Sequence, residues 1–161
     1  MHGVIAIFLE NWTSFFSNHA ALRTLIDFFH IGGLVIAGGF AISADRMTLR
    51  ASRRGVAERA LQLEALRSTH RIVVFSLAAV TGSGLLLLAA DADVFLHSVF
   101  FWTKMGLVVA LLINGFFLTV AERRAETDAV RGWKWLAVAS TLSVALWMLT
   151  TLAGAALPNI G

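Results

Sequence analysis

Residues 25–44, LIDFFHIGGLVIAGGFAISA, form an apolar stretch long enough to cross a bilayer as a helix, yet they include Asp27 and His30. A charged side chain at membrane depth costs at least about 2.5 kcal/mol, so such residues usually face the bundle interior and meet a partner, an ion or a cofactor. On a helix of 3.6 residues per turn, the two residues share one side with small and apolar residues: Leu34, Ala37, Gly38 and Ala41. We call these last four the narrow face. The bulky residues point toward lipid or other helices: Phe28, Phe29, Ile36 and Phe40.

The whole chain is too apolar for a soluble domain. Of its 161 residues, 58% are hydrophobic and 14% are charged, and there is one proline. There is no Cys, which excludes disulfides and thiolate metal sites and leaves His, Met and carboxylates as ligands. The basic residues lie between apolar stretches, where they act as topology signals, so we expect lipid and no nucleic acid as a partner.

We predict four membrane spans, covering about residues 22–44, 72–90, 94–120 and 136–157. The segments 45–71 and 121–135 are predicted to be polar loops, and a short turn is expected at Asp91 and Asp93. The two loops hold eleven of the thirteen Lys and Arg residues, so the positive-inside rule places them in the cytoplasm. Both termini are then periplasmic, in a bacterial inner membrane. Trp133 and Trp135 are expected in the interfacial aromatic belt.

Residues 1–20 place apolar side chains at helical spacing against polar ones, which is typical of an amphipathic helix lying in the membrane interface. The segment lacks the basic start and cleavage site of a signal peptide, so we expect it to be retained. The predicted organisation is therefore all-α, with an interfacial helix at 1–20 and a four-helix membrane bundle at 21–161.

The polar residues of the spans are predicted to gather in the outer half of the bundle. His30 and Lys104 each lie about eight residues below the outer start of a span, roughly 12–15 Å deep, so they can meet. His97 is expected about two turns above Lys104 on the same face, and Asp27 is expected to pair with Lys104. The inner half holds little beyond Asn114, Ser76 and hydroxyl groups, so we expect any chemistry on the outer side.

From Asp27 onward the chain resembles the four-helix copper-resistance D (CopD) type membrane superfamily, and most of all its DUF6644 branch. The resemblance rests on FFHIGG at 28–33, on TGSGLLLLAADADVFLHSVFFWTKMGLVVALLINGFF at 81–117 and on LSVALWMLTTLAG at 142–154. A more distant similarity is to HemJ-type proteins, which have a histidine in the first helix, a lysine in the third and a bound haem b. His30 and Lys104 match those two positions. The similarity implies haem binding without implying the oxidase activity of that family.

Several interpretations of these residues stay open. His30 is either a satisfied polar residue, a haem ligand or an ion ligand, and His97 is the candidate second axial ligand. Gly32 and Gly33, with Gly82 and Gly84, would open a slot for the macrocycle. Lys104 either pairs with Asp27, neutralises a haem propionate or relays a proton.

The main functional prediction is a b-type haem protein that transfers electrons with a quinone or a periplasmic partner. One alternative is copper handling through outer His and Met residues, among them His2, His19, His97 and Met105. Another is a non-catalytic anchor subunit, within a homo-oligomer or a larger complex.

Overall fold

The computed structural model describes residues 2–160, with side chains from 7 to 156; the side chain of His2 is outside the described part. Across these residues there are six helices and no strand, and four helices are long and apolar enough to cross a membrane, which confirms the all-α four-helix membrane fold. The helices are α1 (His2–Asn18), α2 (Ala20–Ala51), α3 (Val56–Ala90), α4 (Ala92–Leu96), α5 (Val99–Thr127) and α6 (Ala129–Ile160).

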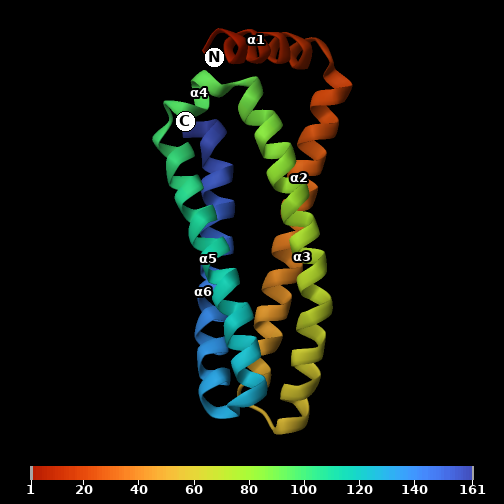
Figure 1. The fold of residues 1–161 in the computed structure, drawn as a ribbon, viewed down its shortest axis with the longest axis vertical. Coiled ribbons are helices and arrows are strands. Elements are labelled where there is room, and N and C mark those ends of the chain that lie inside the picture. Colours follow the sequence, from red (N-terminus) through yellow and green to blue (C-terminus); the bar gives the residue numbers. More distant parts are fainter. Residues whose placement is uncertain (1, 161) are drawn as a thin grey trace.

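The four long helices form two antiparallel hairpins, α2–α3 and α5–α6, which meet mainly through α2 and α6 (Figure 1). We call the end that carries α1 and α4 the outer end, and the end with the two hairpin turns the inner end. Helix α1 and the C-terminal end of α6 both lie at the outer end (Figure 1), as an even number of spans requires.

The predicted loops at 45–71 and 121–135 are wrong in extent, because most of both segments is helical. Residues 52–55 join α2 to α3, and only Asp128 separates α5 from α6. Arginine and glutamate are good helix formers, so α2 and α3 continue past the apolar stretch rather than stopping at the first charge. Gln62 holds this extension together, since its Nε2 donates to the Ala44 carbonyl at 3.2 Å and to Thr48 Oγ1 at 3.1 Å.

The narrow face of α2 packs as predicted. Ala37 is completely buried, and it clusters with Leu111 on α5 and with Leu146 and Trp147 on α6. A Cβ on Gly38 would lie 3.2 Å from Trp147 Cε3, so this glycine lets the indole lie directly on the α2 backbone. The bulky side of α2 is exposed, as expected for a surface that faces lipid: Phe28, Phe29, Ile36 and Phe40.

Helix α1 ends at Asn18 and lies across the outer end of the α2–α3 hairpin (Figure 1). Trp12 Nε1 donates to the Leu86 carbonyl at 3.0 Å, and Thr13 Oγ1 donates to the Ala90 carbonyl at 2.9 Å. The second bond satisfies a carbonyl in the last turn of α3, which has no partner within its own helix. The predicted N-terminal helix is thus attached to the bundle through the end of α3.

The inner end is closed by tight contacts. A Cβ on Gly132 would lie 2.3 Å from the Ala125 nitrogen, so only glycine fits where α6 turns back on α5. Arg59 caps the end of α2 through the Ser52 carbonyl at 2.6 Å, and its guanidinium lies 5.3 Å from the centre of the Trp133 ring. Trp133 is 3% exposed and packs inside the bundle, contrary to the prediction that it faces the membrane interface, whereas Trp135 is 59% exposed.

Candidate functional site

His30 lies half-buried in the outer half of the bundle, between α2 and α3. Its Nδ1 is 3.1 Å from the Val80 carbonyl and 3.2 Å from Ser83 Oγ. A carbonyl only accepts, so Nδ1 carries the hydrogen and the neutral ring keeps its lone pair on Nε2. The Ser83 hydroxyl accepts from His30 as well, because its own hydrogen goes to the Ala79 carbonyl at 2.7 Å. His30 is therefore oriented by α3 with one nitrogen left as a ligand.

The glycines predicted to open a slot have more specific roles. A Cβ on Gly84 would lie 3.1 Å from His30 Cε1, so Gly84 makes room for the imidazole itself. A Cβ on Gly33 would lie 2.8 Å from Val80 Cγ2, so Gly33 allows α2 and α3 to approach closely. Gly32 and Gly82 have nothing within 4 Å of such a Cβ and border open space.

Lys104 faces the same region from the other hairpin. Lys104 is half-buried, and it packs against α6 at Gly154: a Cβ added to this glycine would lie 3.8 Å from Lys104 Nζ. Both Lys104 and Asp27 lie close enough to His30 for their charges to act on its ring. The predicted ion pair with Asp27 is wrong: Asp27 is exposed, and among the described residues the only ion pair joins Arg67 to Glu126. A half-buried ammonium without a carboxylate partner is suited to an anionic group of a ligand.

His97 is not on the helix of Lys104, contrary to the prediction. It follows α4, and α5 begins after Ser98, whose Oγ accepts from the Phe101 amide at 3.4 Å. The side chain of His97 is exposed, and its Nδ1 lies 2.7 Å from the Asp93 carbonyl. His97 therefore lies with Ser98 in the short link between α4 and α5 and not on the α5 face that carries Lys104.

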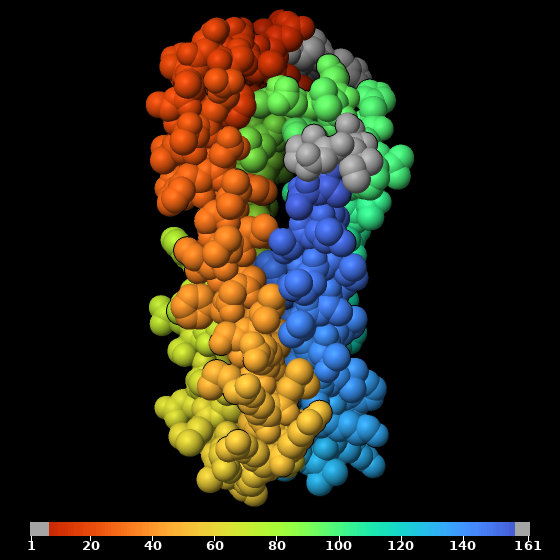
Figure 2. Space-filling model, turned by 180° about the vertical axis from the view of Figure 1, so that it is seen from behind, coloured from red at the N-terminus to blue at the C-terminus, as the bar shows by residue number. Residues whose placement is uncertain are grey.

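The two hairpins separate toward the outer end. Figure 2 shows that α2 and α6 diverge there and that the molecule is hollowed between them, below α1 and α4. From 20 to 32, Ile26 is the only residue of α2 classed as buried, whereas the narrow face farther along is tightly packed. His30 and Lys104 thus belong to opposite hairpins around the least closed part of the bundle.

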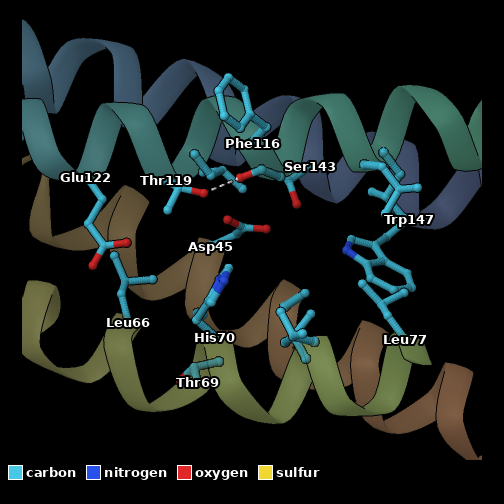
Figure 3. Close-up of a pocket in the computed structure, with 18 of the residues that line it drawn as sticks. Asp45, Leu66, Thr69, His70, Leu77, Phe116, Thr119, Glu122, Ser143 and Trp147 are labelled. Atoms are coloured by element: carbon cyan, nitrogen blue, oxygen red, sulfur yellow. Dashed lines mark hydrogen bonds between the residues drawn. The ribbon is translucent and has the colours of Figure 1, made fainter. Parts of the chain in front are cut away.

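A second site, which sequence reasoning missed, lies in the inner half. A cavity of about 280 Å³ is bounded by all four long helices, and its polar residues are Asp45, Thr69, His70, Thr119, Glu122 and Ser143. Figure 3 shows the Asp45 carboxylate between the His70 ring of α3 and the Ser143 hydroxyl of α6. The expectation that the inner half holds little beyond Asn114, Ser76 and hydroxyl groups is therefore wrong, while the expected place of the chemistry stays a prediction.

Asp45 is the most constrained residue of this cavity. It is 4% exposed, and the hydroxyl groups of Ser140 and Ser143 lie beside its carboxyl group, but no described residue donates a hydrogen bond to its Oδ2. Buried polar atoms are almost always partnered, so an orphaned carboxylate oxygen beside a cavity needs an explanation. The spacing of the narrow face contains the missing signal, since one further turn beyond Ala41 ends at Asp45.

Neither site groups enough side chains for a metal held by protein alone. Across the described residues, no cluster of three His, Cys, Asp or Glu side chains could hold a metal ion. Comparisons with protein families, curated proteins and solved structures find no match. The resemblance to the copper-resistance D superfamily and to HemJ-type proteins therefore stays a prediction.

Proposed function

We propose that the protein binds one b-type haem in the outer half of the bundle, with His30 as the axial ligand. The observation that carries the proposal is the hydrogen bond from His30 Nδ1 to the Val80 carbonyl. Histidines that ligate metals commonly donate their other ring nitrogen to a carbonyl, which fixes the tautomer and the direction of the free Nε2. A haem brings four nitrogen ligands of its own, so one imidazole is sufficient and no Cys is needed.

Lys104 supports the same assignment from the opposite hairpin. Its ammonium has no carboxylate partner among the described residues and would neutralise a propionate. The macrocycle would lie between the outer ends of the two hairpins, where Ile26 is the only buried residue of α2 from 20 to 32. His97 is exposed after α4, so the proposal assigns the iron to His30 alone and leaves His97 outside the site.

A bound b-type haem supplies reversible one-electron transfer between its ferrous and ferric states. His30 would hold it, Val80 and Ser83 would orient His30, and Lys104 would fix the propionate side. We propose a redox component of the inner membrane, exchanging electrons with a quinone or a periplasmic partner. The concentration of basic residues toward the inner end supports a periplasmic outer end.

Copper handling is less well supported by this geometry. It would require several His and Met side chains to converge, and the described histidines are dispersed. His19 bonds to the Phe15 carbonyl and His97 to the Asp93 carbonyl, while His30 lies between α2 and α3 and His70 lines the inner cavity. A role as a membrane anchor would not explain why His30 is oriented by α3 or why Lys104 has no carboxylate partner among the described residues.

The test is the reduced-minus-oxidised spectrum of protein purified after expression with ample haem supply. The wild type should show the bands of a b-type haem, and His30→Ala should lose most of them. His19→Ala is the matched control, because His19 is also a histidine with Nδ1 on a backbone carbonyl, but it is exposed on the outer end. Full haem content in His30→Ala, or a colourless wild type with or without copper, would overturn the proposal.

A further inference from the structure

The inner cavity is formed by residues that have no part in the proposed haem site. Its volume, about 280 Å³, is near the lower limit for ligand pockets, so it suits a single ring with a short substituent and not a macrocycle. Most of its wall is apolar and includes Leu66, Leu77, Leu111 and Trp147. An occupant must therefore be largely apolar and small.

The cavity opens on the side between α3 and α5, away from the α2–α6 contact. Three of its wall residues on that side are exposed: Val74, Leu112 and Phe116. All three are apolar and lie on membrane-spanning helices, so the opening faces lipid. An occupant would enter from the bilayer.

The polar residues of the cavity determine which hydrogen-bonding groups and which charge a ligand must have. Asp45 is 4% exposed, and its Oδ2 accepts no hydrogen bond from the described residues, although the hydroxyl groups of Ser140 and Ser143 lie beside the carboxyl group. Glu122 adds a second carboxyl group to the same cavity. A phosphate would meet two carboxyl groups and, as the only basic side chain of the cavity wall, His70, so the balance of charge disfavours a phospholipid headgroup. A neutral molecule with a hydroxyl donor satisfies Asp45 without bringing in a charge.

We infer that the inner cavity binds the headgroup of a membrane-soluble quinol, which donates a ring hydroxyl to Asp45 Oδ2. The ring would lie beside Trp147, whose indole nitrogen is on the cavity side in Figure 3. A flat ring against an indole is a favourable aromatic contact. The binding site is separate from His30, so its occupancy can be tested whether or not haem binds.

The test uses decylubiquinol and decylubiquinone, titrated anaerobically into the full-length protein in lipid nanodiscs. Quenching of Trp147 fluorescence reports binding, and Trp147→Phe supplies the background from the other tryptophans. Only the quinol has a hydroxyl donor, and hydrogen bonds to charged groups are worth more than one factor of ten in affinity. The quinol should therefore bind at least about tenfold more tightly than the quinone.

Two glycines on α5 provide a matched pair of variants. A Cβ on Gly115 or on Gly106 meets nothing within 4 Å, so a side chain can start at both positions without a clash. Gly115 lines the cavity, and Gly106 lies about two and a half turns away without lining it. Gly115→Leu should abolish saturable quenching, whereas Gly106→Leu should bind as the wild type does.

A third variant, Asp45→Asn, tests the hydrogen bond itself by replacing the carboxylate with an isosteric amide. It should reduce the preference for quinol over quinone to less than about threefold, because the charged acceptor is gone. Absence of saturable quenching in the wild type would overturn the inference. Equal binding in Gly115→Leu, an unchanged preference in Asp45→Asn, or a co-purified phospholipid that the quinol does not displace would do the same.

Discussion

Replacing Asp45 with leucine should stabilise the protein while removing its polar centre. Asp45 is 4% exposed and holds one oxygen without a hydrogen-bond partner among the described residues. Leaving a buried polar group unsatisfied costs about 1–3 kcal/mol, and the adjacent cavity of about 280 Å³ has room for the larger side chain. We therefore expect Asp45→Leu to raise the free energy of unfolding by about 1–3 kcal/mol.

Thermal unfolding in a mild detergent measures this effect. For a chain of this length, 1 kcal/mol shifts the midpoint by about 2–4 °C, so the midpoint should rise by about 2–12 °C. Asp93→Leu is the control, because Asp93 is an exposed carboxylate on α4, and its substitution should change stability by no more than about 0.5 kcal/mol. A lower midpoint in Asp45→Leu would show that the carboxylate is satisfied in the folded protein and would refute the reasoning.

Three further predictions concern packing and topology. Gly132→Ala should lower the free energy of unfolding by about 1–3 kcal/mol, because the new Cβ meets the α5 backbone. Gly39→Ala, whose Cβ meets nothing within 4 Å, should raise it by up to about 1 kcal/mol, and chemical denaturation measures both. Asn114→Ala should cost about 1–3 kcal/mol in the same assay, since its Nδ2 donates to an α6 carbonyl at 3.1 Å. In intact cells, an impermeant thiol reagent should label a cysteine at Ala92 and spare one at Ala57; the opposite pattern would reverse the orientation.

The number of spans and the packing face of the first one follow from sequence because both depend on apolar periodicity. The length of the helices does not follow from the sequence, since a cluster of arginines predicts the side of the membrane but not whether the segment is an irregular loop or a helix. The segment around Arg59 and Gln62 was predicted to be a loop for that reason, although both residues are compatible with helix.

The same error concealed the inner cavity. The sequence pattern predicts a loop from Asp45 onward, whereas the helix continues and places Asp45 one turn beyond Ala41 on the narrow face. The position of His97 has a different cause, because the five-residue helix α4 is too short to show a period. The bonds of His30 to α3 depend on helix register between distant segments, which one sequence does not reveal.

The most direct test of the central claim is chemical rescue of the haem site. His30→Gly removes the imidazole and leaves a space of its shape beside Gly84, so this variant should be purified with little haem. Adding imidazole together with haem should restore the wild-type spectrum, because the free base can occupy the same position next to the Val80 carbonyl. Haem content that equals that of the wild type before imidazole is added, or a spectrum that imidazole does not restore, would contradict ligation by His30.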